Sequence, residues 1–128
     1  MTNKPASLAS HDTPDIGSKL TTLDPSAGYI TIINTYAVAP ERAEALLNLL
    51  VRATAETIRF VPGFGSANFH INLDRTQVVN YAQWRSREAI AAAGTDPKVV
   101  ARIREAAQLV KSFTPILYEF RQSVTADE

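Results

Sequence analysis

The chain has 128 residues and no cysteine, and its 13 lysines and arginines balance its 13 aspartates and glutamates, so its formal charge is zero. Apolar residues make up 45% of the sequence, which is typical of one ordinary soluble domain. The composition excludes disulfides and thiolate metal sites, and two histidines, His11 and His70, are too few for a histidine-based zinc site without several carboxylates. A neutral chain also has no electrostatic attraction to phosphate backbones, so we expect no nucleic-acid partner.

The first 28 residues differ in composition from the rest, with three prolines, many serines, threonines and aspartates, and only scattered apolar residues. We expect residues 1–28 to form a flexible N-terminal arm; the alternative is that Leu20 and Leu23 pack on the domain or on a partner subunit. No apolar run in the arm suits a secretory signal, and none elsewhere approaches the roughly 18–20 residues needed to span a bilayer. We therefore expect a cytoplasmic protein with no membrane partner.

Periodicity of the apolar residues predicts the first two elements of the folded part. Residues 29–38 are rich in β-branched and aromatic side chains, which is typical of a strand, and Pro40 follows where a helix can begin. Apolar side chains then recur every three or four residues over 41–60, which predicts a helix. Pro62 and Gly63 end that pattern.

The remaining elements complete a βαββαβ order. They are strands at 64–73 and 77–84 joined by a short turn at 74–76, helical segments at 87–93 and 97–110, and a strand at 115–124. This order predicts an α+β, ferredoxin-like sandwich in which two helical regions cover one face of a four-stranded antiparallel sheet. The expected domain spans residues 29–124, and residues 125–128 form a short C-terminal tail.

The first strand is apolar on both sides. Ile33 and Ala37 point one way, and Ile30, Ile32 and Tyr36 point the other way. Because two helices cover only one face of a sheet, we expect the second face to be buried by another copy of the chain. The prediction is a two-fold homodimer built face to face, and a monomer with a ligand groove on that face is the alternative.

The hairpin formed by strands 64–73 and 77–84 has a predicted register. Centring the turn on Arg75 places Phe69 opposite Tyr81 on the helix-facing side of the sheet. The same register places His70 opposite Asn80 on the second face. Polar and aromatic side chains therefore gather on that second face.

These side chains form a candidate small-molecule site, because an apolar chamber with a few convergent polar groups is the usual make-up of a ligand pocket. The predicted cluster contains Asn34, His70, Asn80 and Trp84, with Tyr36 and Asn68 on the same face as expected substrate-binding residues. Buried amides without partners would cost roughly a few kcal/mol, so a ligand or ordered water is expected to contact the asparagines. Each residue also has a structural alternative, such as packing, a backbone hydrogen bond or a place in the dimer interface.

Residues 61–84 (VPGFGSANFHINLDRTQVVNYAQW) carry a family resemblance. The segment PGF followed by a strand, a short turn and VVNYAQW, with Ser86 opening a helix, resembles the antibiotic biosynthesis monooxygenase family, and the resemblance extends over residues 29–124. It implies a dimeric α+β barrel and a monooxygenase that oxidises phenolic, anthrone-like polycyclic substrates to quinones. It further implies dioxygen as co-substrate, no metal or flavin cofactor, and a small aromatic molecule as partner.

The resemblance also implies catalytic residues. Asn80 and Trp84 match an asparagine and a tryptophan, four residues apart, that form part of the family's pocket. Asn34 looks like the family's asparagine on the first strand, and His70 looks like a histidine ten residues before the second asparagine. An arginine of the later helix belongs to the pattern, and its spacing from the tryptophan points to Arg104.

The family pattern does not assign every site residue of this chain. Arg102 and Arg104 lie on opposite shoulders of the apolar helix face, each at about 100° from it, so periodicity does not choose between them, and solvation is the alternative for either. Ile90 stands near the place where some family members have a tyrosine, so any role of such a phenol is absent or moved here.

The implied chemistry consists mostly of electrostatics and positioning, because a deprotonated phenol can pass an electron to dioxygen without a metal. His70 or a water would transfer the proton, and Arg104 would stabilise the phenolate or peroxide. Asn34, Asn80 and the indole N–H of Trp84 would orient substrate and oxygen. Two alternatives stay open: a small-ligand-binding barrel without this catalysis, and a haem-degrading monooxygenase, which is disfavoured because no histidine follows His70.

Overall fold

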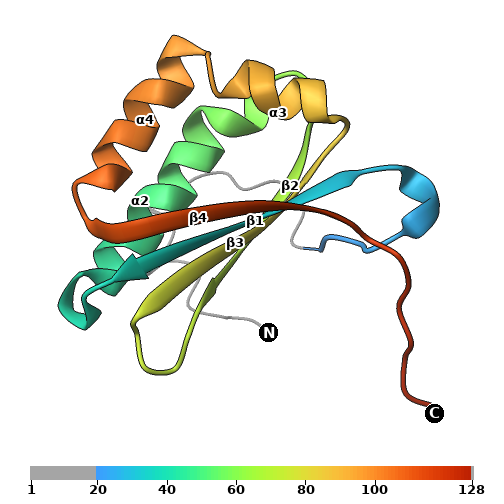
Figure 1. Ribbon diagram of the computed structural model, residues 1–128, viewed down its shortest axis with the longest axis horizontal. Coiled ribbons are helices and arrows are strands. Elements are labelled where there is room, and N and C mark those ends of the chain that lie inside the picture. The colour runs from blue at the N-terminus through green and yellow to red at the C-terminus, as the bar shows by residue number, and fades with distance from the viewer. Residues whose placement is uncertain (1–19, 128) are drawn as a thin grey trace, which may run out of the picture.

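Four antiparallel strands form one sheet in the computed structural model, which describes residues 20–127, and helices cover one face of that sheet (Figure 1). The elements in chain order are the 3-10 helix η1 (Pro25–Ala27), β1 (Ile30–Val38), the 3-10 helix η2 (Pro40–Arg42), α2 (Ala43–Glu56), the 3-10 helix η3 (Ile58–Phe60), β2 (Phe64–Ile71), β3 (Gln77–Trp84), α3 (Arg87–Ala93), α4 (Pro97–Ala107) and β4 (Val110–Glu119). The strand order is β2-β3-β1-β4. The predicted ferredoxin-like α+β sandwich is confirmed.

The later helices begin where the sequence places capping residues. Ser86 accepts a hydrogen bond from the backbone N–H of Ala89 and opens α3. Asp96 accepts one from the N–H of Lys98, and Pro97, which has no N–H to satisfy, occupies the first turn of α4. These caps divide the second helical region into the two predicted pieces.

The core lies between α2 and the helix-facing side of the sheet. Leu46 of α2 is fully buried, and it packs in one cluster with Val38 of β1 and Val78 of β3. Because side chains alternate along a strand, the same side of β1 also carries Ile32, Asn34 and Tyr36. The helices therefore cover the face that holds the polar residues of β1, which corrects their predicted assignment to the opposite face.

The last strand begins earlier than predicted. β4 spans Val110–Glu119 instead of residues 115–124, and α4 ends at Ala107 instead of extending to Val110. Pro115 lies within the strand, opposite Asn34. An edge strand tolerates proline because only one of its sides belongs to the hydrogen-bonded ladder, and the sequence prediction wrongly took Pro115 as the start of the strand.

The hairpin between β2 and β3 is shifted by one residue from the predicted register. Phe69, not His70, lies opposite Asn80. The loop is longer than expected because the side-chain oxygen of Asn72 accepts hydrogen bonds from the N–H groups of Thr76 and Gln77, both at 2.8 Å. Asn72 thus closes a four-residue loop in which Arg75 has a positive φ of 62°. Since side chains alternate, the shift moves His70 to the opposite face from Asn80.

The described end of the predicted arm lies against the outer face of the sheet, the face away from the helices. The hydroxyl of Thr21 donates to Oδ1 of Asn68 at 2.8 Å, and Nε2 of Gln83 donates to the carbonyl of Thr22 at 3.1 Å. Leu20 and Leu23 are 82% and 51% exposed, so the contacts of the arm with its own domain are polar, and packing of the two leucines on a partner subunit stays a prediction. The predicted arm residues 1–19 lie outside the described range.

None of the helices within residues 20–127 is long and apolar enough to cross a membrane.

Candidate active site

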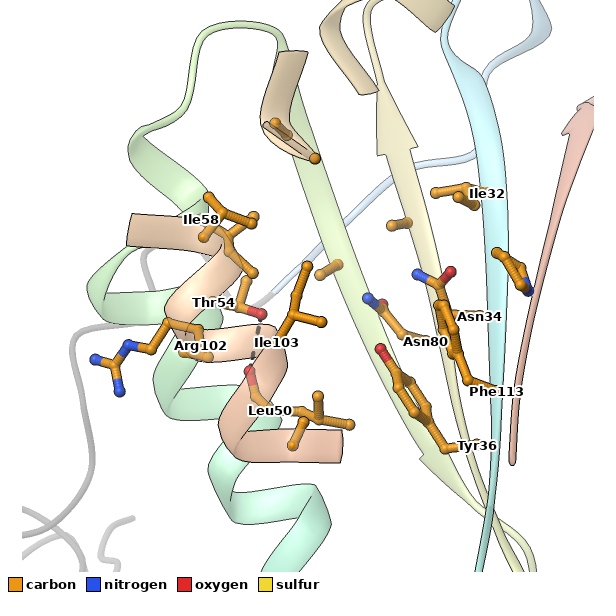
Figure 2. A pocket seen from close by; sticks show the side chains of 18 of the residues that line it. Ile32, Asn34, Tyr36, Leu50, Thr54, Ile58, Asn80, Arg102, Ile103 and Phe113 are labelled. Carbon is orange, nitrogen blue, oxygen red and sulfur yellow. Dashed lines mark hydrogen bonds between the residues drawn. The ribbon is translucent and has the colours of Figure 1, made fainter. Parts of the chain in front are cut away.

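A cavity of about 330 Å³ opens between the helix-facing side of the sheet and helices α2, α3 and α4. Its walls are mostly apolar and come from every strand of the sheet, and Leu50, Ile58 and Ile103 extend into it from the helix side (Figure 2). Ile103 is 51% exposed although it belongs to the apolar stripe of α4, because its side chain faces this open space. The volume suits a small organic ligand.

Asn34 and Asn80 place two amides on the sheet wall of the cavity. They lie directly opposite each other on β1 and β3. Oδ1 of Asn80 accepts a hydrogen bond from the backbone N–H of Asn68 at 3.1 Å, so the Nδ2 group of Asn80 is left as the donor toward the cavity. Within residues 20–127, no protein group bonds the Asn34 side chain, which can therefore either donate or accept.

Tyr36 adds a phenol beside the two amides. It follows Asn34 by two residues on β1, and its ring stacks on Phe113 of β4 with centroids 4.9 Å apart and planes 29° apart. The hydroxyl points from the sheet toward the helices, next to the amide of Asn80 in the view of Figure 2. Burial raises the pKa of Tyr36 to about 12, which keeps the phenol protonated at neutral pH.

Trp84 forms part of the wall at the end of β3. Its position four residues after Asn80 puts both side chains on the same face of the strand. The indole is 6% exposed and meets the ring of Phe64 edge to face, with centroids 5.4 Å apart and planes at 90°. This packing holds the indole as a rigid aromatic surface against which a flat ligand can stack.

The two candidate arginines of α4 differ in position. Arg102 lines the cavity, and Arg104 is exposed and does not line it. The guanidinium of Arg102 points away from the sheet (Figure 2), where its Nε donates to the hydroxyl of Thr57 at 3.2 Å and its terminal nitrogens pair with Glu56 and Glu105. The cavity-facing part of Arg102 is therefore its hydrocarbon chain.

His70 and Asn68 lie outside the cavity because of the register shift of the hairpin. His70 is exposed on the outer face of the sheet, opposite Val79, with Nδ1 3.2 Å from the carbonyl oxygen of Asn68. The Asn68 side chain binds Ser66, Tyr81 and Thr21 on that face. The predicted cluster on one face is thus corrected: the structure brings together Asn34, Tyr36, Asn80 and Trp84, and it places His70, Asn68 and Arg104 elsewhere.

Part of the cavity wall was not predicted from the sequence. Phe113 was not predicted as a site residue because β4 was expected to begin at Pro115, two residues later. The signal was the β-branched and aromatic stretch 113–118 (FTPILY), which begins before Pro115. In the part of the chain that the structure describes, no group of three or more histidine, cysteine or acidic side chains is arranged to hold a metal ion.

Comparisons with known proteins connect this site to one enzyme family. The family model described as antibiotic biosynthesis monooxygenase matches residues 29–101. The chain is 45% identical over 80 residues to tetracenomycin-F1 monooxygenase of Streptomyces glaucescens, which covers 62% of this chain and 71% of that protein.

Solved structures share the fold. The monooxygenase from the gene ActVA-Orf6 of Streptomyces coelicolor, solved in complex with nanaomycin D, superposes with a TM-score of 0.73 at 30% identity, covering 81% of this chain and 96% of that one. SnoaB of Streptomyces nogalater, described as a cofactor-independent oxygenase, superposes with a TM-score of 0.64 at 22% identity, covering 77% of this chain and 99% of its own.

Proposed function

The chain belongs to the antibiotic biosynthesis monooxygenase family, and we propose that it oxidises a phenolic, anthrone-like polycyclic substrate to a quinone with dioxygen and without a metal or flavin. The family match confirms the predicted monooxygenase. Its relatives are a tetracenomycin-F1 monooxygenase and an enzyme solved with nanaomycin D, and a fused aromatic substrate is proposed for this chain by analogy with them.

One observation carries the proposal: the opposed amides of Asn34 and Asn80, with the phenol of Tyr36, are the polar groups of the sheet wall in a mostly apolar cavity. Apolar walls and the indole of Trp84 suit the faces of a flat polycycle. The amide donors suit its oxygen atoms, and they gain strength from an environment that excludes water. The cavity thus matches an uncharged or singly ionised aromatic ligand.

In the proposed reaction the substrate supplies the electrons. Loss of a proton to water gives an electron-rich anion, which reduces dioxygen and then forms a carbon–oxygen bond with it. The resulting peroxide loses water, so that overall a CH₂ group and O₂ become a C=O group and H₂O. Asn80 Nδ2 is proposed to donate to the anionic oxygen, and Asn34 to orient the substrate, which are positioning and electrostatic roles.

We propose that a second copy of the chain covers the outer face of the sheet. Ile116 and Tyr118 of β4 lie on that face and are 47% and 45% exposed, next to the partly buried Ile33 of β1. Exposed apolar side chains on one sheet face favour burial by a partner. Light scattering coupled to size-exclusion chromatography should give twice the monomer mass, and a monomer mass at micromolar concentration would contradict the homodimer.

Oxygen uptake tests the function. Metal-free protein mixed with a panel of anthrones and other phenols should consume oxygen with at least one of them. The double variant Asn80→Ala with Trp84→Phe should lose that activity, because it removes a donor and alters the aromatic wall. Unchanged uptake by this variant would refute the site.

Two outcomes favour the alternatives. A shift in melting temperature with one ligand class, without oxygen consumption, would indicate a ligand-binding barrel. A saturable Soret band on haem titration would indicate a haem enzyme. The haem alternative lacks support, because no histidine of residues 20–127 lines the cavity.

A further inference from the structure

We propose that Tyr36 is a catalytic residue of this oxygenation and that its hydroxyl donates the proton that lets the peroxide intermediate release water. The proposal rests on the proposed function and names a proton donor within the same site.

The position of Tyr36 gives its hydroxyl access to a ligand bound in the cavity. The ring is anchored from one side by Phe113, while the hydroxyl points into the space between the sheet and the helices (Figure 2). No group of residues 20–127 takes up the hydroxyl hydrogen, so it is available to a ligand. The hydroxyl also lies on the same wall as Asn34 and Asn80, whose amides would hold the oxygen atoms of the substrate.

Other side chains of the cavity wall are poorly suited to this proton transfer. Arg102 lines the cavity, but its guanidinium is directed outward and paired with Glu56 and Glu105. The hydroxyl of Thr54 donates to the carbonyl oxygen of Leu50 at 2.8 Å. His70, the predicted proton-transfer residue, lies on the opposite face of the sheet. Among the described residues that line the cavity, Tyr36 is thus the titratable side chain whose acidic group faces the ligand space.

The proton balance closes with one phenol. Dioxygen bonds to the substrate carbon, and the peroxide anion so formed takes up from solvent the proton that the substrate lost in the first step. The O–O bond of this hydroperoxide then breaks, and the departing hydroxide takes up the Tyr36 proton and leaves as water. The remaining C–H bond of that carbon breaks at the same stage, its electron pair forms the second bond of the C=O group, and its proton returns to the Tyr36 phenolate through solvent. The substrate is oxidised by two electrons in this elimination, the peroxide is reduced, and the phenol is regenerated.

Burial of Tyr36 supports this role. Its pKa is raised to about 12, so the donor form is fully populated at neutral pH. A phenol of this acidity is a poor donor to neutral carbonyl oxygens and a competent one to a departing hydroxide, whose conjugate acid is much weaker. The phenol is thus matched to the O–O cleavage step.

The test compares Tyr36→Phe with the wild-type protein. The substitution keeps the ring that stacks on Phe113, and Tyr29→Phe is the matched control, because it removes a phenol oxygen outside the cavity and keeps the ring on which Arg85 lies. For Tyr36→Phe we expect the kcat for quinone formation to fall roughly 100-fold or more, the Kd of the quinone product to stay unchanged, and the substrate hydroperoxide to accumulate in place of the quinone. Tyr29→Phe should behave as wild type.

A fluorinated tyrosine at position 36 gives a second readout, because it keeps the shape and makes the phenol more acidic. The alkaline limit of kcat should move to lower pH. Wild-type kcat in Tyr36→Phe, or an unmoved pH profile in the fluorinated protein, would overturn the role of Tyr36 and leave the proposed function standing. Absence of oxygen uptake by the wild-type protein with every phenol tested would overturn both.

Discussion

Asn34 and Asn80 lie directly opposite each other on the adjacent antiparallel strands β1 and β3, with their side chains on the helix-facing wall of the cavity. A one-residue slip of either strand would send one amide to the outer face. The pair therefore depends on the register of the central strands. The backbone N–H of Asn68 further fixes the Asn80 amide with its oxygen toward β2, which leaves the nitrogen as donor.

The donor role of Asn80 predicts different effects for two substitutions. Asn80→Ala should lower kcat by about 10²–10³-fold, as expected for removal of a donor to a developing anion. Asn80→Asp keeps an oxygen that accepts from the Asn68 N–H, so the protein should stay folded, yet it loses the donor and should be as inactive as Asn80→Ala. Oxygen uptake and thermal unfolding measure the two effects. An active Asn80→Asp variant would show that the amide is needed only for its bond to the backbone.

Substitution of the two arginines of α4 should have different effects on stability. Arg102 joins α4 to the end of α2 through Thr57 and Glu56 and is partly buried, so Arg102→Met should lower the free energy of unfolding by about 1 kcal/mol. Arg104 is exposed and away from the cavity, and Arg104→Met should retain stability and kcat. Urea denaturation and oxygen uptake of both variants check this. A large loss of kcat in Arg104→Met would instead support the role implied by family resemblance.

Gln83 should be the main link between the described end of the N-terminal arm and the sheet. It is 4% exposed, accepts from the hydroxyl of Ser66 at 2.7 Å and donates to the carbonyl of Thr22 at 3.1 Å. Gln83→Ala should lower the free energy of unfolding by about 1–3 kcal/mol, because it removes a buried side chain and both of its hydrogen bonds. The control Gln77→Ala removes an exposed side chain of the same strand and should change stability by less than about 0.5 kcal/mol. Equal stability of the two variants in urea would contradict this.

Tyr36 should make the protein sensitive to high pH. Its pKa is raised from the ordinary value of 10.0 to about 12, so below pH 10 both the folded and the unfolded chain hold the proton. Above that pH the unfolded chain loses the proton first, and stability should fall by up to about 1.4 kcal/mol per pH unit until the folded phenol also ionises. The wild-type protein should therefore lose more stability than Tyr36→Phe between pH 9.5 and about 11 in urea denaturation. Parallel curves for the two proteins would contradict the burial effect.

Local signals predicted most of the fold. The capping residues Ser86 and Asp96 predicted where two helices begin, and the pattern of residues 77–84 predicted a strand. The structure confirms all three. Two errors came from effects that local patterns do not express. Pro115 is tolerated inside β4 because that strand is an edge, and edge position is a property of the whole sheet.

The second error concerned the site. The Asn72 side chain closes a four-residue loop, and this shifts the register of the hairpin by one residue. A single step of register reverses which face each side chain occupies, so His70 left the predicted cluster while Asn80 and Trp84 stayed together. Side-chain alternation alone predicts which residues of one strand share a face. Which residues lie opposite each other across the hairpin depends on the hydrogen bonds of the Asn72 side chain.

The proposed function requires that the cavity between sheet and helices oxidises its substrate with dioxygen alone. A single-turnover experiment under ¹⁸O₂, with metal-free protein and an anthrone that supports oxygen uptake, tests this requirement. We predict no quinone under anaerobic conditions and, after admission of ¹⁸O₂, one quinone per O₂ consumed with one ¹⁸O atom at the new carbonyl and the other in water. Quinone formation without oxygen, or a new carbonyl oxygen derived from solvent under conditions that exclude exchange, would rule out a monooxygenase that uses dioxygen alone.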